Sequence, residues 1–251
     1  MTASWLLLLA TTCGVTVAQD SSIAHLLSRT PFSVAGIVVD STGTPIEGVR
    51  IAHSFLWNLA TLRPVTTGKN GQFRLDTFAP AVVFRKEGWV AQRVAITGGK
   101  ADLRVVLDPA AQPVAMEACV GKSRRYSVFG GIFYLPVTKR IRAGHEDSSI
   151  DTFGREFTVK TRLGRGRLTH GAGTAWGGPE PRDREVWSSV EYDERVIQAG
   201  MVRLLDARGR TADGKLWRHI GGAGESAFYF DTNAEAAVIF DQMLDGMCLA
   251  Q

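Results

Sequence analysis

Residues 34–107 alternate short apolar, β-branched runs with turn residues, and this alternation constrains the fold more than any other feature of the chain. A first run at residues 36–39 gives way to Gly43 and Pro45 before a second run at residues 49–51. Later runs are closed by Gly, Lys or Asp at a spacing of roughly ten residues. Such spacing predicts the short strands of a β-sandwich and not a series of strand-helix-strand units.

An Asn-Gly pair stands at the centre of residues 66–75, between a polar and an alternating segment. Asn70 and Gly71 are the residue types that most readily adopt the positive φ angles of a tight turn. We therefore predict a β-hairpin at this point.

These residues resemble the carboxypeptidase regulatory-like domain, a transthyretin-like β-sandwich, over residues 33–108. The matching positions are Gly36, Asp40, Gly43, Pro45, Ile46, Gly48, the turn at residues 66–73 and Lys86-Glu87-Gly88-Trp89. In zinc carboxypeptidases this module accompanies the catalytic domain without taking part in the reaction. The resemblance therefore implies support, positioning or binding. Residues 55–63 depart from the pattern with an apolar insertion, which we interpret as a crossover covering the core, with a ligand-binding loop as the alternative.

Residues 1–18 have the pattern of a cleaved signal peptide, with an apolar core at residues 5–10 and small residues before Gln19, although no Lys or Arg precedes that core. They predict a secreted or periplasmic protein. Lipid attachment at Cys13 is disfavoured because Thr12 is larger than the residue that normally precedes such a cysteine. No later segment approaches the roughly 18 to 20 apolar residues that cross a bilayer, so we predict no transmembrane segment in the mature chain.

Removal of the signal peptide would leave two cysteines, Cys119 and Cys248. An even pair in an exported chain favours a disulfide. Because the bond would close a loop spanning most of the second half, it could stabilise the folded state by up to ~5 kcal/mol. Two free thiols or a metal pair are the alternatives, but no nearby His completes a zinc site.

Pro109 and Pro113 mark a boundary between two domains. We predict a sandwich at residues 31–108, a linker at 109–117 and a second domain at 118–251. Strand-like segments in the second domain lie at residues 129–136, 156–162, 166–169, 186–192, 201–205, 215–220 and 226–230. Thr232 and Glu235 have the form of a capping box, and they open a helix that ends at Gly246. Its apolar face consists of Ala236, Phe240, Met243 and Met247. The predicted fold class is mostly β, with an N-terminal β-sandwich followed by an α+β or mostly β domain closed by a C-terminal helix.

Charge is unevenly distributed in the second domain. Six cations occur with no acid between Glu117 and Glu146, namely Lys122, Arg124, Arg125, Lys139, Arg140 and Arg142. Beyond Arg218 every charged residue is acidic, namely Glu225, Asp231, Glu235, Asp241 and Asp245. We favour mutual neutralisation of these two sets within the fold, with anionic lipid or an acidic polymer as the alternative partner of the cations. Nucleic acid is disfavoured because the net charge is only +4 and no recognition motif is present.

The chain carries five His but no His-Glu-x-x-His or related spacing, so we predict no metal ligands, no cofactor and no assigned catalytic residue. Acidic clusters at residues 145–147 and 191–194 could supply the paired carboxylates of a hydrolase. Trp176, Trp187 and Trp217 are candidate ligand contacts, because exposed Trp can stack on sugars, although burial is their commoner fate. The sequence thus favours an exported, noncatalytic accessory or binding protein for a carbohydrate, a peptide or an envelope component. A secreted hydrolase with carboxylates in the second domain is the alternative.

Overall fold

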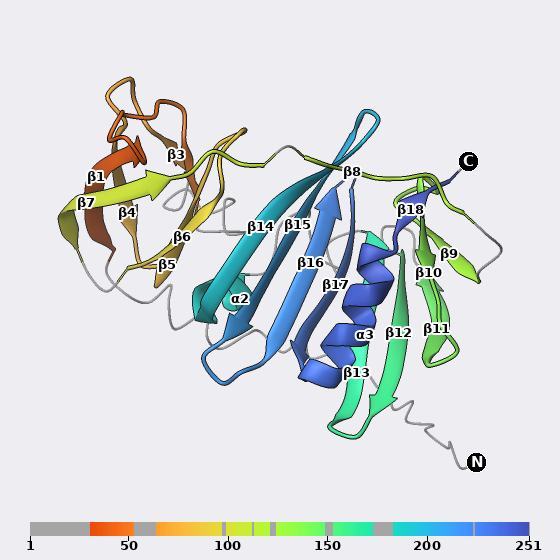
Figure 1. Cartoon of the computed structure of the whole chain (residues 1–251). Coiled ribbons are helices and arrows are strands. Elements are labelled where there is room, and N and C mark those ends of the chain that lie inside the picture. Colours follow the sequence, from red (N-terminus) through yellow and green to blue (C-terminus); the bar gives the residue numbers. More distant parts are fainter. Residues whose placement is uncertain are drawn as a thin grey trace, which may run out of the picture.

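The computed structural model describes residues 31–52, 64–96, 99–111, 113–120, 124–148, 153–172, 183–222 and 224–250. The predicted signal peptide, the insertion at residues 55–63 and Trp176 lie outside these ranges. Within them the protein is mostly β, as predicted, with a sandwich followed by a larger sheet that carries the helix α3 (Figure 1).

The N-terminal half is a β-sandwich of two sheets. One sheet has the order β4-β1-β7 and the other the order β3-β2-β5-β6. The strands are β1 (Phe32–Asp40), β2 (Arg50–Ala52), β3 (Val65–Thr66), β4 (Gln72–Thr77), β5 (Ala81–Arg85), β6 (Gln92–Ala95) and β7 (Lys100–Leu107). Their inward side chains form one core, in which Phe73 of β4 meets Phe84 of β5 edge to face at 5.3 Å between ring centroids. The alternating runs of the sequence are therefore explained by burial between two sheets.

The hairpin predicted at Asn70-Gly71 is wrong, although the turn itself forms. Gly71 has a φ of 70°, and its carbonyl accepts a hydrogen bond from the Val38 amide at 2.9 Å. The strands on either side of the turn, β3 and β4, belong to different sheets. The Asn-Gly signal thus predicted the local reversal, but the sheet that each strand joins depends on distant partners.

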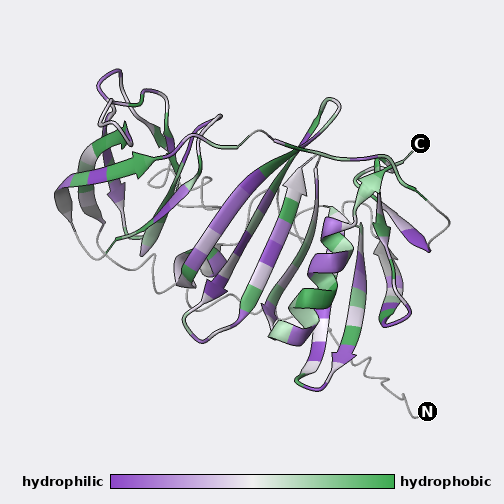
Figure 2. Cartoon of the chain, viewed as in Figure 1, coloured by the Kyte–Doolittle hydropathy of each residue, from purple (hydrophilic) through white to green (hydrophobic). Residues whose placement is uncertain are grey.

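The second half is built on a sheet of eight strands in the order β11-β12-β13-β17-β16-β15-β14-β8. Its strands are β8 (Val114–Ala115), β11 (Ile141–Ser148), β12 (Phe153–Thr161), β13 (Gly164–Ala172), β14 (Ser189–Ala199), β15 (Val202–Thr211), β16 (Leu216–Gly222) and β17 (Glu225–Thr232). A small sheet at the far end combines β9 (Arg125–Val128), β10 (Phe133–Pro136) and β18 (Cys248–Leu249). Hydrophilic and hydrophobic residues alternate along many of these strands (Figure 2).

Several elements differ from the sequence-based expectation. Residues 129–132, predicted as strand, form a turn, and the strands β9 and β11 were not predicted. Residues 186–188, predicted as strand, belong to the short helix α2 (Asp183–Ser188). Part of the predicted linker forms β8, which pairs in parallel with β14. The predicted capping box is shifted by one residue, because Thr232 still pairs with Leu216 in the sheet and Asn233 caps the helix.

Helix α3 (Ala234–Asp245) packs its apolar face on the large sheet. Ala236, Phe240 and Met243 are buried as predicted, Met247 beyond the helix is buried too, and Gly246 forms the C-cap. None of the helices in the described ranges is long and apolar enough to cross a bilayer.

The predicted bond between Cys119 and Cys248 is present, with 5.0 Å between the two Cα atoms. Backbone hydrogen bonds reinforce it, since the Cys119 amide donates to the Leu249 carbonyl at 3.1 Å and the Leu249 amide donates to the Glu117 carbonyl at 2.9 Å. The disulfide therefore ties the start of the second domain to the strand that follows α3.

The two halves meet through β5, β6, α2 and β14. Val83 of β5 packs with Val186 and Trp187 of α2 in a small apolar cluster. Beside it, the Arg85 guanidinium on β5 forms an ion pair with the Glu194 carboxylate on β14 at 2.8 Å. Both side chains are largely shielded from water, at 13% and 7% exposed, so the contact fixes the sandwich against the larger sheet.

We predict that replacing both cysteines, as Cys119→Ser with Cys248→Ser, lowers the free energy of unfolding of the second domain by about 2–5 kcal/mol, because the open loop gains entropy when unfolded. Denaturant titration measures the loss. Mass spectrometry after alkylation supplies the chemical control, in which wild-type protein gains two capped thiols only after reduction. Equal labelling without reductant would show that the bond does not form.

Candidate functional site

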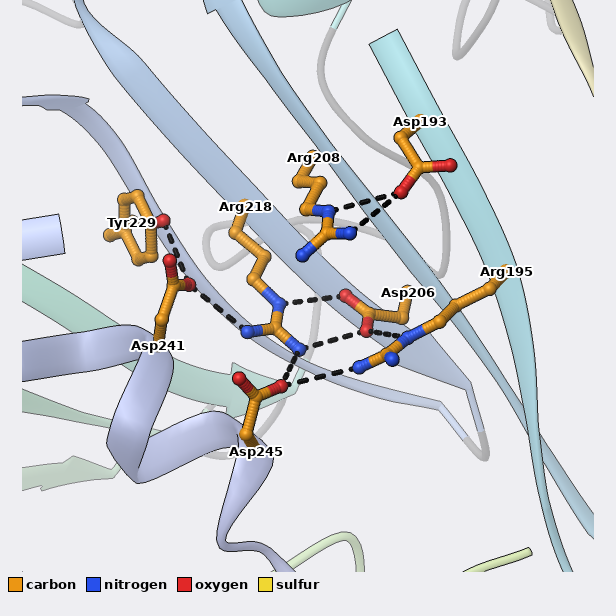
Figure 3. Close-up of polar contacts among 8 residues, drawn as sticks. All are labelled: Asp193, Arg195, Asp206, Arg208, Arg218, Tyr229, Asp241 and Asp245. Carbon is orange, nitrogen blue, oxygen red and sulfur yellow. Dashed lines mark hydrogen bonds and ion pairs between the residues drawn. The ribbon is translucent and has the colours of Figure 1, made fainter. Parts of the chain in front are cut away.

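The buried guanidinium of Arg218 on β16 is the centre of a polar network that holds α3 on the sheet (Figure 3). Its Nε and Nη2 donate to the two carboxylate oxygens of Asp206 on β15, each at 2.8 Å. From the helix, Asp241 accepts from Nη1 at 3.0 Å and Asp245 accepts from Nη2 at 2.7 Å. Because residues four apart share one helix face, a single buried cation fixes both the rotation and the height of α3.

The charges in this network compensate one another. Burial alone would lower the pKa of Arg218. The contacts with Asp206, Asp245 and Asp241 outweigh burial, so the pKa lies above its ordinary value. Burial likewise would raise the pKa of Asp206, yet Arg218 and Arg195 hold it below its ordinary value. Burial and the nearby Asp241 carboxylate raise the pKa of Tyr229, whose hydroxyl donates to Asp241 at 3.0 Å. Two arginines, Arg195 and Arg218, are thus paired with three aspartates, and these groups are positioned to stabilise the fold.

The structure shows how the acidic residues that follow Arg218 in the sequence are paired. Asp241 and Asp245 bind Arg218, Glu225 binds His170 at 2.7 Å, and Glu235 binds Arg162 at 2.8 Å. None of these contacts reaches the cations at residues 139–142. The expectation that the acids neutralise the basic stretch is therefore wrong for this part of the stretch.

The unneutralised cations border a groove of about 1070 Å³ beside α3, which we call the basic groove. It is lined by Lys139, Arg140, Arg142, Thr158, Val159, Lys160, Thr161, Arg162, Arg165, Glu235, Val238, Ile239 and Gln242. The lining comes from the turn before β11, from β11 to β13 and from the exposed side of α3. The groove therefore joins segments that are up to about a hundred residues apart in the chain.

Six of the lining side chains are cationic and only Glu235 is acidic. Glu235 pairs with Arg162, whose side chain is 92% exposed. Within the described residues, the remaining five cations form no ion pair, namely Lys139, Arg140, Arg142, Lys160 and Arg165. All five are exposed. The basic groove thus carries an excess of positive charge that nothing in this part of the protein offsets.

The predicted acidic cluster at residues 191–194 does not form a catalytic pair. Asp193 binds Arg208 at 2.9 Å, and Glu194 binds Arg85 on the sandwich. Glu191 accepts from Arg210, and this hydrogen bond holds the pKa of Glu191 below its usual range. A general acid needs a raised pKa, which is the opposite effect. The side chains of Glu146 and Asp147 lie outside the described residues.

Two of the three predicted ligand-contact tryptophans are buried. Trp217 is 1% exposed, and its indole NH donates to the Ser189 hydroxyl at 2.8 Å. Trp187 is 8% exposed, and its carbonyl accepts from Arg93 of the sandwich at 2.6 Å. Neither indole presents a face for stacking on a surface sugar, so these two predictions are wrong. A role for Trp176 stays a prediction.

A second buried pair, His170 and Glu225, was not found from the sequence. The two side chains come from neighbouring strands, β13 and β17, and Glu225 also accepts from the Gly130 amide at 2.5 Å. Their separation in the sequence carries no spacing signal, and only the strand order brings them together. Ser226, next to Glu225, is fully buried, so it cannot meet a substrate. Among the described residues, no group of three His, Cys, Asp or Glu side chains is arranged to hold a metal ion.

No family model matches the chain, and no curated protein matches it. A solved streptococcal ancillary pilin is similar over 57% of this chain and 53% of its own, at 12% identity and a TM-score of 0.24. The match thus spans about half the length of that pilin. A DUF3823 family protein from Bacteroides ovatus matches over 80% of this chain and 95% of its own, at 8% identity and a TM-score of 0.23. A second, from Parabacteroides merdae, covers 79% and 95% at 11% identity and a TM-score of 0.21. At these TM-scores the likenesses carry no functional argument.

We predict that Asp206→Asn lowers the free energy of unfolding by about 3–5 kcal/mol near neutral pH, because it breaks a buried ion pair. The pKa of Asp206 is lowered in the fold, so its stabilising effect is present above the ordinary value of 3.8 and is lost as the pH falls below it. The difference between wild type and variant should therefore shrink on acidification. Denaturant titrations at several pH values measure this difference.

The control is Asp193→Asn, in an exposed ion pair, which should lower the free energy of unfolding by less than about 1 kcal/mol. Equal losses in the two variants would contradict the assignment.

Proposed function

We propose that this protein is an exported, noncatalytic accessory protein that binds an anionic envelope component in the basic groove. The observation that carries the proposal is the set of five exposed cations that form no ion pair among the described residues and border one concavity. Like charges that line one groove repel one another, and an anionic ligand relieves the repulsion. A binding site accounts for this arrangement better than a stability role does.

The rest of the domain supports a binding role for the groove. Its α3 wall is anchored by Arg218, which is fully buried, and does not depend on the ligand for its position. A groove with a preformed wall loses little conformational entropy on binding. The hydrolase alternative has less support, because the carboxylates of Glu191, Asp193 and Glu194 are occupied by arginines.

We assign residues 33–108 to a carboxypeptidase regulatory-like module that supports the second domain. Its two-sheet architecture and its contacts through Arg85 and Arg93 favour this role. Arg203 adds an exposed ion pair to Glu87 at 3.0 Å across the same boundary. Export is favoured by the signal-like residues 1–18 and by the Cys119–Cys248 disulfide, since such bonds persist in oxidising compartments.

The test compares migration of the protein in native gels that contain either polygalacturonate, as an anionic polymer, or neutral dextran. Wild type should be retarded by polygalacturonate alone, and salt should weaken the retardation because exposed charges are screened. The double variant Arg140→Ala with Arg142→Ala should lose most of it.

The matched control is Lys69→Ala with Arg104→Ala, which removes the same charge from exposed positions on the sandwich. This control should behave as wild type. Equal loss in both double variants would mean that net charge alone causes the retardation, and the assignment of the groove would fail.

A further inference from the structure

We infer that the turn between β12 and β13 docks on a lipid bilayer that carries anionic headgroups, and that Leu163 enters the boundary between headgroups and acyl chains. The inference rests on the proposed function, because the cations around this turn belong to the basic groove, and it names the envelope component as anionic lipid. A second feature carries it that the proposed function does not use, namely an exposed apolar side chain at the tip of the turn.

Leu163 lies at the tip of the hairpin formed by β12 and β13, at the lower end of the large sheet in Figure 1. Thr161 and Gly164 face each other as the last pair of this ladder, so Arg162 and Leu163 form the turn. Leu163 is 64% exposed, and the positive φ in this region is supplied by Gly164, at 121°. Leu163 therefore contributes neither to the core nor to the conformation of the turn.

Cations flank this tip on both faces of the sheet. Lys160 and Arg165 lie opposite each other in the ladder, one pair back from the tip. Because successive side chains of a strand point to opposite faces and Val159 packs in the core with α3, Lys160 and Arg165 lie on the face away from the helix. On the helix side, Arg162 binds Glu235 of α3 and is still 92% exposed. A partner that approaches the sheet end-on therefore meets positive charge on both sides of the tip.

The turn before β11 adds charge at the same end of the sheet. Ile141, the first residue of β11, pairs with Val159, so Lys139 and Arg140 lie level with the last residues of β12. Both cations are exposed and line the basic groove. Val238 of α3 lines the same groove and is 56% exposed. This end of the sheet thus combines several cations with two exposed apolar side chains.

The combination fits an anionic bilayer better than a soluble polyanion. Lys and Arg side chains are attracted by the negative surface potential of anionic lipids. An apolar side chain that reaches the acyl boundary leaves water, which favours binding independently of charge. A soluble polyanion would engage the cations but would leave Leu163 in water. Because the tip of a hairpin makes the contact, the buried residues of the groove need not reach the membrane.

The first measurement is co-sedimentation with vesicles made of equal parts phosphatidylglycerol and phosphatidylcholine, with pure phosphatidylcholine vesicles as the reference. The protein should sediment with the anionic vesicles only, and salt should weaken binding because exposed charges are screened. The double variant Arg140→Ala with Lys160→Ala should lower the affinity about thirtyfold. The matched control on the sandwich, Lys69→Ala with Arg104→Ala, should bind as wild type does.

The apolar contact is tested separately with Leu163→Ala. This variant should lower the affinity for anionic vesicles about tenfold. It should leave the retardation by polygalacturonate unchanged, because only a bilayer takes up the apolar side chain. The control is Met201→Ala, which alters a fully exposed side chain in the turn between β14 and β15, at the opposite end of the sheet (Figure 1). The control should bind vesicles as wild type does.

A polarity-sensitive fluorophore reports whether the tip enters the bilayer. Attached to the variant Leu163→Cys, its emission should shift to shorter wavelength when anionic vesicles are added. The same fluorophore attached to Met201→Cys should show no shift.

The outcomes separate the two proposals. If neither polygalacturonate nor anionic vesicles bind, the proposed function fails. If polygalacturonate binds and the vesicles do not, the proposed function stands and the choice of lipid is overturned. Vesicle binding that Leu163→Ala leaves unchanged, with no emission shift from the fluorophore at residue 163, would overturn docking through the β12–β13 turn.

Discussion

The buried guanidinium of Arg218 is the constraint on which the second domain depends. A charge that is fully shielded from water is tolerated only when it is paired and hydrogen-bonded, and here Asp206 of the sheet and two aspartates of α3 meet that need. The sheet alone could not satisfy all the donors of the guanidinium. The helix must therefore lie where Asp241 and Asp245 reach it, and the position of α3 in turn creates one wall of the basic groove.

The same arrangement divides the charges of the domain. Acids near the end of the chain pair with Arg218, His170 and Arg162, and they do not reach Lys139, Arg140 or Arg142. The fold thus neutralises its interior and leaves positive charge on one surface. A protein with a net charge of only +4 can in this way present a strongly cationic site. The small net charge of the whole chain conceals this local excess.

Local signals in the sequence predicted where strands and helices form better than they predicted which strands pair with one another. The period of apolar residues predicted the sandwich and the buried face of α3, because burial on one side imposes that period. The helix is capped by Asn233 and not by the predicted Thr232, because strand pairing holds Thr232 in the sheet. Which sheet β3 or β4 joins depends on contacts far along the chain, so the Asn-Gly turn was mistaken for a hairpin. The cysteine count identified the disulfide because only one intramolecular pairing was open once Cys13 was assigned to the signal peptide.

The candidate site was only partly visible before the fold was known. The run of cations at residues 122–142 pointed to a basic surface, but Lys160 and Arg165 join it only through the pairing of β12 with β11 and β13. Trp187 and Trp217 were misassigned because the sequence alone does not distinguish a tryptophan that is buried in a core or at a domain boundary from one that binds a ligand. Burial, which depends on tertiary structure, decides between the two.

The most direct test of the account is amide hydrogen exchange with and without polygalacturonate, because it locates the bound ligand on the folded protein without altering any residue. We expect added protection at residues 139–142 and 158–165 and along α3, with exchange in the sandwich unchanged. Protection confined to the sandwich would contradict the account.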